Sequence, residues 1–259
     1  MRPALSLQVL DRRIRFFVRG NLAAEYRYDV VPPEWTCLNA PERRTVLVAL
    51  RHARGFWNGA LLTVREAETL VRRGAYSLGF QQTFLWHSPE YGDLLTETCT
   101  ARVAPGPCDG FLLDLTLMLH AQGRMPLTSV PDSPALLTAV LPSALLPDGG
   151  GQIRNGEGLY GIETLDGRAS AWTGATGVIY GETVGVIWLD HPDNPCHPPV
   201  WRVDAHGQIA PCPFLERPLS LPPSATLRWR YRILVHRGYV EQGWAGARLQ
   251  EFARTPAPA

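Results

Sequence analysis

The sequence predicts an all-β protein, built as one large antiparallel β-sandwich, and three observations support this. Apolar and polar residues alternate with a period of two through most of the chain, as in strands that bury one face. Turn-forming pairs such as Asp166-Gly167, Gly106-Pro107 and Gly181-Glu182 separate the alternating segments, at the roughly 8–12-residue spacing typical of sandwiches. Only residues 62–73 and 241–254 carry a helical pattern, so we expect one or two short helices.

The expected strands follow from this alternation. The clearest is at residues 111–120, where Leu113, Leu115, Leu117 and Leu119 share one face. In residues 226–234 the apolar side chains share one face, and Arg228, Arg230 and Arg232 share the other. In chain order, the remaining expected strands are residues 5–11, 13–19, 24–30, 45–52, 76–88, 94–103, 158–165, 175–181 and 184–190.

The chain has no obvious internal boundary. Its 23 prolines are scattered through loops, and there is no repeat, phosphate loop or dinucleotide fingerprint. We therefore expect one β-sandwich domain over residues 1–259, with residues 255–259 as a disordered tail.

Composition excludes several classes of function. Of the 259 residues, 45% are apolar and 19% are charged, so there is enough material for a buried core. The net charge of +1 argues against a nucleic-acid partner held by bulk charge. All 25 basic residues are Arg, which excludes a lysine nucleophile or Schiff base.

The cysteines and the hydropathy pattern indicate a cytoplasmic protein. The five cysteines are odd in number and show no CxxC spacing, which argues against a disulfide framework or a zinc ribbon. Asp11, Arg12 and Arg13 interrupt the apolar N-terminus too early for a signal peptide. No window approaches the ~20 apolar residues of a membrane span, so we expect no membrane partner.

Two segments resemble the DUF6807 family, whose members often carry the label "PmoA family protein". In the second half of the chain, residues 190–201 read DHPDNPCHPPVW and match an Asp-His-Pro-x-Asn-Pro-x-His-Pro segment leading to a Trp. A later strand, residues 227–238, reads LRWRYRILVHRG and matches the family's Tyr-Arg strand ending near His-x-Gly. In the first half, residues 25–41 and 51–57 (RHARGFW) match a Tyr-rich strand and a His-rich segment more loosely.

The resemblance implies a supersandwich similar to galactose mutarotase and a role with carbohydrates, in some members beside a sugar oxidoreductase. A membrane methane oxygenase is excluded, because such a subunit needs several transmembrane helices. The chain departs from the family pattern at Ala53, where a second His is usual, and at residues 58–62, which replace a His-Gly-Asp stretch. If the missing histidines form a catalytic site in the family, this member has lost part of it.

The proline-rich loop at residues 190–199 is the strongest candidate site. Asp190, His191, Asn194 and His197 lie within eight residues, and prolines between them stiffen the backbone. We predict that His191 or His197 acts as a general acid or base with Asp190, and that Asn194 binds substrate. The alternative is structural: Asp190 caps the loop, and the histidines satisfy buried carbonyl groups.

The other candidates lie elsewhere in the sequence. His52 is a further acid-base candidate, and the predicted substrate-binding residues are Arg54, Trp57, Trp201, Arg202 and Arg230. Tryptophan could stack on a pyranose face, and arginine could bind a carboxylate or vicinal hydroxyl groups. For the arginine strand, the alternative is a solvated face balanced by acids such as Glu97. Because the histidines show no metal-site spacing, we predict no metal and no cofactor.

Three functions therefore remain open. The protein acts on a sugar or keto-sugar, or binds one without turnover, or serves as the structural partner of a sugar oxidoreductase.

Overall fold

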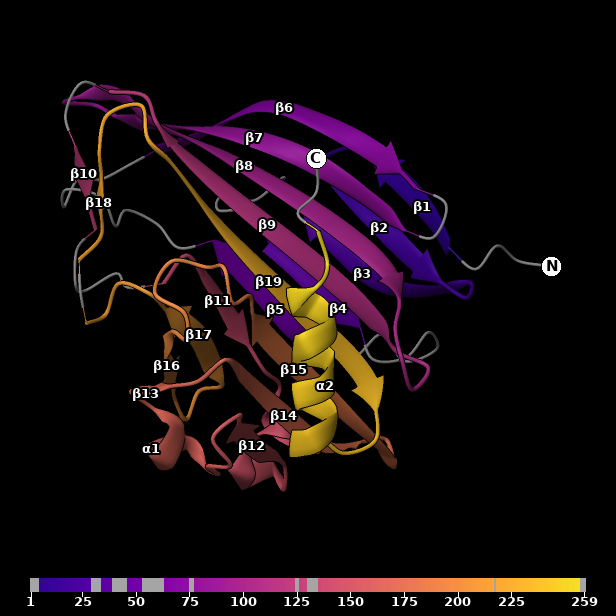
Figure 1. The fold of residues 1–259 in the computed structure, drawn as a ribbon. Coiled ribbons are helices and arrows are strands. Elements are labelled where there is room, and N and C mark those ends of the chain that lie inside the picture. The colour runs from indigo at the N-terminus through magenta and orange to yellow at the C-terminus, as the bar shows by residue number, and fades with distance from the viewer. Residues whose placement is uncertain are drawn as a thin grey trace.

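The structure is a computed structural model, and it describes residues 5–28, 34–38, 46–52, 63–74, 77–123, 126–129, 135–216 and 218–256. Two large antiparallel sheets dominate it (Figure 1). This confirms the prediction of an all-β sandwich. Within the described residues, no helix has the length and apolar character needed to cross a membrane.

The first sheet has nine strands, and most of the N-terminal part of the chain forms one half of it. In spatial order its strands are β1 (Leu5–Leu10), β2 (Arg13–Val18), β3 (Asn21–Arg27), β4 (Glu34–Leu38), β5 (Val46–His52), β11 (Leu137–Val140), β17 (Gln208–Cys212), β16 (Val200–Val203) and β13 (Arg168–Ala169).

The second sheet has eight strands and contains the longest ones. In spatial order they are β12 (Gln152–Asn155), β14 (Trp172–Ile179), β15 (Glu182–Asp190), β19 (Thr226–Arg237), β9 (Phe111–Ala121), β8 (Gly92–Pro105), β7 (Leu78–Ser88) and β6 (Thr63–Arg73). Strands β10 (Leu127–Thr128) and β18 (Ser220–Leu221) pair with each other in a separate two-stranded antiparallel sheet.

Alternating apolar side chains from both sheets form one shared core. Leu113, Leu115, Leu117 and Leu119 of β9 are all buried in it, as predicted. On β19 the core face carries Trp229, Tyr231 and Ile233, and nine-stranded-sheet residues such as Trp35 and Trp201 belong to the same cluster. The alternate residues of each strand point away from this core, where they can contribute to sites on the outer faces of the sheets.

The tight turn between β14 and β15 has a local cause. Tyr180 and Gly181 both have positive φ, 53° and 80°, which is the geometry of a two-residue hairpin turn. Glycine adopts this conformation without steric cost, so the predicted turn at Gly181 forms.

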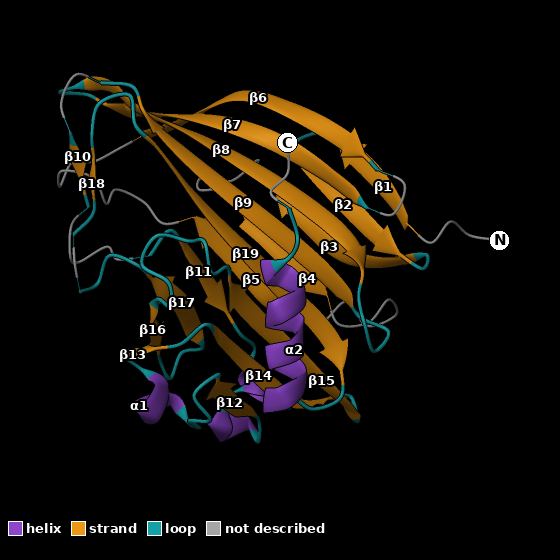
Figure 2. Cartoon of the chain, viewed as in Figure 1, coloured by secondary structure: helices purple, strands orange, loops and turns teal. Residues whose placement is uncertain are grey.

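Of the two predicted helices, one is confirmed. Helix α2 (Gln242–Ala253) lies across the outer face of the eight-stranded sheet (Figures 1 and 2). Its Ala245 and Phe252 pack with Ile187 and Leu234 of that sheet. The helix thereby covers apolar residues that face away from the main core.

The helix predicted at residues 62–73 is wrong. Residues 63–73 form β6, which pairs with β7 along its whole length at the edge of the eight-stranded sheet. A bulge between Glu66 and Glu68 adds one residue to the strand and breaks its alternation, which gives it a helix-like spacing of apolar residues. Pairing with a long neighbouring strand outweighs the helix propensity of this Arg- and Glu-rich segment.

The strand predicted at residues 158–165 is also wrong. Helix α1 (Ile162–Leu165) forms there, after Gly161 with a φ of 86°. Ile162 and Leu165 pack on the core, and their spacing of three residues suits one helical turn. Two 3₁₀ turns, Ser143–Leu145 and Pro147–Gly149, complete the described helices (Figure 2).

Candidate functional site

The proline-rich loop that follows β15 is fixed by a hydrogen-bonded network centred on Asn194. The side-chain amide of Asn194 donates to Asp190 Oδ1 and to the backbone carbonyl of Arg230, each at 2.7 Å. Its Oδ1 accepts the backbone N–H of Arg230, also at 2.7 Å. Asn194 is buried, and two of these bonds tie the loop to β19 while the third ties it to the end of β15.

Asp190 and His197 form a close pair at the same place. Asp190 Oδ2 lies 2.6 Å from His197 Nδ1, and the Asp190 side chain is 2% exposed whereas that of His197 is 21% exposed. Burial raises the pKa of Asp190, and the hydrogen bonds from His197 and Asn194 act in the opposite direction. A buried carboxylate thus orients an imidazole that reaches solvent.

Behind this pair, Tyr231 lies in the core. Within the described residues, its hydroxyl has no hydrogen-bond partner. Its pKa is raised well above the usual value, first by burial and then by the negative charges of Asp190, Cys212 and Cys196.

His191 is directed away from solvent. It is 1% exposed, and its Nε2 accepts a hydrogen bond from Arg230 Nη1 at 2.7 Å. The guanidinium donates to Nε2, and the backbone N–H of Asp193 lies 3.1 Å from the other ring nitrogen, Nδ1. Burial lowers its pKa, and so does the charge of Arg230. The ring edge packs on Phe252, with centroids 4.9 Å apart.

The predicted substrate-binding residues divide into three groups. Trp201 is 1% exposed, packs edge-on against Trp188 and donates its indole N–H to the Ser170 carbonyl at 2.8 Å, so it belongs to the core. Arg202 lies on the outer face of the nine-stranded sheet, and Arg230 lies on the outer face of the eight-stranded sheet. Arg54 and Trp57 lie outside the described residues. For His52 only the backbone is described, and it pairs with Leu137.

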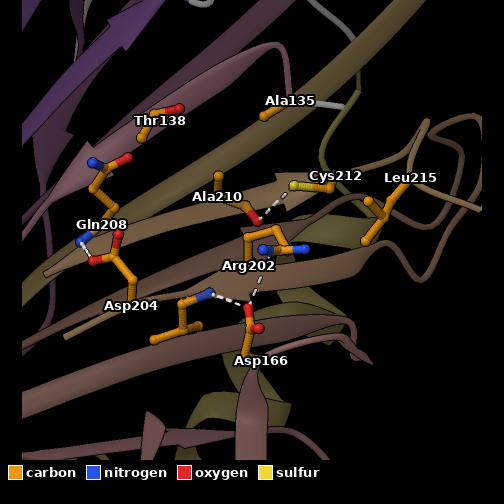
Figure 3. A pocket seen from close by; sticks show the side chains of 10 residues that line it. Ala135, Thr138, Asp166, Arg202, Asp204, Gln208, Ala210, Cys212 and Leu215 are labelled. Carbon is orange, nitrogen blue, oxygen red and sulfur yellow. Dashed lines mark hydrogen bonds and ion pairs between the residues drawn. The ribbon is translucent and has the colours of Figure 1, made fainter. Parts of the chain in front are cut away.

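A pocket of about 600 Å³ lies on the outer face of the nine-stranded sheet, and we call it the Arg202 pocket. Its polar lining is Thr138, Asp166, Arg202, Asp204 and Gln208. Arg202 has a 57% exposed side chain and one ion pair, from Nε to Asp166 Oδ1 at 3.2 Å. Figure 3 shows Arg202 between a polar end, with Thr138, Gln208 and Asp204, and an end formed by Cys212 and Leu215.

Two side chains of this lining are held in a defined state. Asp204 Oδ1 accepts the backbone N–H groups of His206 and Gln208, both at 2.9 Å, which fixes the carboxylate. Burial raises the pKa of Cys212 to about 12, so its thiol is an unreactive part of the wall.

The comparison with protein families decides the affiliation of this chain. A model described as "Family of unknown function (DUF6807)" matches residues 48–250. The chain belongs to the DUF6807 family. The match covers more than half of the chain and includes the loop network and the Arg202 pocket.

Other comparisons add little about this DUF6807 protein. No curated protein matches its sequence. Among solved structures, the α-galactosidase from Lactobacillus brevis is 10% identical with a TM-score of 0.41, over 77% of this chain. The DUF6807 chain spans only 30% of that enzyme. We draw no conclusion on function from a similarity this low.

Sequence reasoning missed most of the pocket lining in this DUF6807 protein. Asp166 was recognised only as a turn residue, and Thr138, Asp204 and Gln208 were not singled out. Alternation along β17 was the available signal, because Ile209 is in the core and its neighbours Gln208 and Ala210 line the pocket. Among the residues that the structure describes, no three His, Cys, Asp or Glu side chains gather as metal ligands.

Proposed function

We propose that this protein binds a carbohydrate or another polyhydroxylated small molecule in the Arg202 pocket. The observation that carries the proposal is the pocket itself, about 600 Å³ with an ionic and amide lining beside apolar walls. That volume is within the range of about 300–1,000 Å³ that small-molecule sites occupy.

The lining offers both donors and acceptors, which hydroxyl groups require. The guanidinium of Arg202 can only donate, the carboxylates of Asp166 and Asp204 accept, and Gln208 does both. Arg202 forms an ion pair with Asp166 through Nε, and its terminal amino groups have no partner among the described residues, so they are available to a ligand.

The first test is a thermal-shift screen of the purified chain against neutral sugars, uronates and keto-sugars, because a ligand that saturates a native site raises the melting temperature. Titration calorimetry then gives the Kd of each hit. We expect Arg202→Gln and Gln208→Ala to weaken binding about tenfold, the effect of losing one or two hydrogen bonds.

Arg168→Gln is the matched control, since Arg168 is exposed on the neighbouring strand β13 and does not line the pocket. It should bind like the wild type. Binding that survives both pocket substitutions places the ligand elsewhere and rejects the proposal. A panel without any hit rejects it too and favours the third function, the structural partner of a sugar oxidoreductase, for which co-purification is the test.

The Asp190–His197 pair favours a second candidate function, proton transfer to a sugar. The buried Asp190 carboxylate accepts the Nδ1–H of His197 in this function. Nε2 of the imidazole, which reaches solvent, is then free to act as a base, as in hydrolytic triads. An aldose that exchanges its anomers would need such a group at its ring oxygen or C1 hydroxyl.

Polarimetry of freshly dissolved aldoses measures this activity. The expected result is catalysed mutarotation that His197→Gln abolishes and His206→Gln, an exposed histidine outside the network, leaves unchanged. Ligand binding without any catalysed mutarotation would reject the second function and keep the first.

A further inference from the structure

The outer face of the eight-stranded sheet carries a second cavity, of about 250 Å³. Strands β8, β9 and β19 pair there in a register that aligns outward side chains in two rows. The first row is Arg102, Asp114 and Arg232, and the second is Thr100, Thr116 and Arg230. We call this space the anion cavity.

The segment that follows β19 covers the cavity. Phe252 of α2 lines it and lies over the guanidinium groups of Arg230 and Arg232, at 5.5 and 4.6 Å from its ring centroid. Thr255 and Pro256 also line it, and their backbone carbonyls accept hydrogen bonds from Arg230 Nη2 at 2.6 and 3.2 Å. These two residues belong to the segment predicted to be a disordered tail, and residues 257–259 lie outside the described part.

Asp114 is shared between two arginines. Arg232 donates to it through Nε, 2.5 Å from Oδ1, and through Nη2, 2.9 Å from Oδ2. Arg102 Nη2 lies 2.5 Å from the same Oδ2. One carboxylate between two guanidinium groups leaves one positive charge uncompensated. Glu97, the expected counter-charge, instead faces the core and accepts the Trp86 indole N–H at 2.9 Å.

Arg230 adds a second charge, and no acid of the described part of the chain bonds to it. Each of its hydrogen bonds goes to a neutral acceptor, namely the His191 ring and the carbonyls of Thr255 and Pro256. Asp193 and Asp114 are the acids that act on it, whereas burial, Arg228 and Arg232 lower its pKa. Asp193 has a 78% exposed side chain, so solvent screens its charge.

We propose that the anion cavity binds a small oxyanion, the carboxylate or phosphate group of a hydroxylated molecule. The buried Arg230 and the partly exposed Arg102 outnumber the one carboxylate in the lining, Asp114, which favours an anion, and arginine forks match both carboxylate and phosphate in geometry. The hydroxyl groups of Thr100 and Thr116 can bind ligand hydroxyls on the same wall. The volume is below that of drug-sized sites, which restricts the ligand to the size of a single sugar. This inference does not depend on the Arg202 pocket, which lies on the other sheet.

Titration calorimetry of the full chain in low-salt, phosphate-free buffer tests it with three probes. Glucuronate represents the carboxylate, inorganic phosphate the phosphate, and glucose is the neutral counterpart of glucuronate. We expect at least one anion to bind at concentrations below about 10 mM, and glucose not to compete with it. Which anion binds more tightly identifies the group that the cavity prefers.

Two arginine variants distinguish binding in the anion cavity from a general attraction between the anion and a basic surface. Arg102→Gln should weaken anion binding about tenfold or more, and the fold should persist because Arg232 still pairs with Asp114 through two bonds. Arg228→Gln removes the same charge from an exposed position on the same face of β19, outside the cavity lining, and should change the Kd less than about twofold. Thr116→Val is a second cavity variant that keeps the charge, and it should also weaken binding.

Three results would overturn the inference. The first is no anion binding at all, and the second is an equal loss in Arg102→Gln and Arg228→Gln. The third is loss of anion binding in Arg202→Gln, which would assign the anion to the Arg202 pocket and leave the proposed function standing.

Discussion

Asn194 connects three polar groups that the loop and β19 bury together. Its amide bonds to the Asp190 carboxylate and to both backbone groups of Arg230, so truncating it removes three buried hydrogen bonds. We expect Asn194→Ala to lower the free energy of unfolding by about 2–4 kcal/mol, measured by urea denaturation.

The neighbouring exposed residue is the matched control for that prediction. Asp193→Ala should change stability by less than about 0.5 kcal/mol, because its side chain is mostly in solvent. If Asn194→Ala is as stable as Asp193→Ala, the network does not hold the loop. The prediction that Asn194 binds substrate would then be favoured again.

The sequence was sufficient to single out this loop but not to separate its buried residues from the one histidine that reaches solvent. Asp190, His191, Asn194 and His197 are all polar and close in sequence, and their spacing says nothing about burial. The division depends on long-range partners: Arg230 lies 36 residues from Asn194 and 39 from His191. Only the pairing of β15 with β19 brings these groups together.

At the scale of an element, α2 is held to its sheet by a small number of contacts. Phe252 is 2% exposed, lies against two guanidinium groups and receives the edge of His191. Phe252→Ala should therefore destabilise the protein by about 3–5 kcal/mol, as for other buried phenylalanines, if the helix unfolds with the rest.

Urea denaturation of this variant, with Gln250→Ala as the control on the exposed face of α2, checks the prediction. A loss of less than about 1 kcal/mol, no larger than that of the control, would mean that α2 contributes little to the fold. Faster hydrogen exchange confined to residues 242–253 would mean that α2 opens separately from the sheets.

Strands β6, β9 and β19 show why some elements can be predicted from their own sequences and others cannot. In β9 and β19 alternation is unbroken, and their core faces were predicted residue by residue. In β6 the bulge hides the alternation, and its pairing partner β7 lies outside any local window. Local sequence patterns are thus enough to predict regular strands, and they fail where pairing with a distant strand determines the secondary structure.

At the scale of the whole molecule, we expect two buried histidines, His191 and His236, to make stability depend on pH. Burial lowers the pKa of His191 and of His236 below the ordinary 6.5; the charge of Arg230 adds to the effect at His191, and a bond to the Arg237 carbonyl opposes it at His236. At His236 the packing is tight, since a Cβ on Gly185 would lie 2.6 Å from Nε2. Both rings are therefore held neutral inside the fold, between a sheet and α2.

The sign of the effect on stability follows from proton uptake. The unfolded chain binds protons at these rings near pH 6.5, whereas the folded chain binds them only at lower pH. Their contribution to stability is complete above pH 6.5 and is lost as the pH falls toward the folded-state pKa values. Asp190 has the opposite sign, because burial raises its pKa above 3.8 and protonation then favours the folded state.

We expect the melting temperature to fall as the pH is lowered from about 7.5 to about 5.5, and to fall less in His191→Gln and His236→Gln. Both variants replace an ionisable ring with a neutral amide, so each removes one source of proton uptake on unfolding. His206→Gln, in which an exposed histidine is replaced, should keep the slope of the wild type. Slopes equal to the wild type in both buried variants would show that other groups drive the acid response.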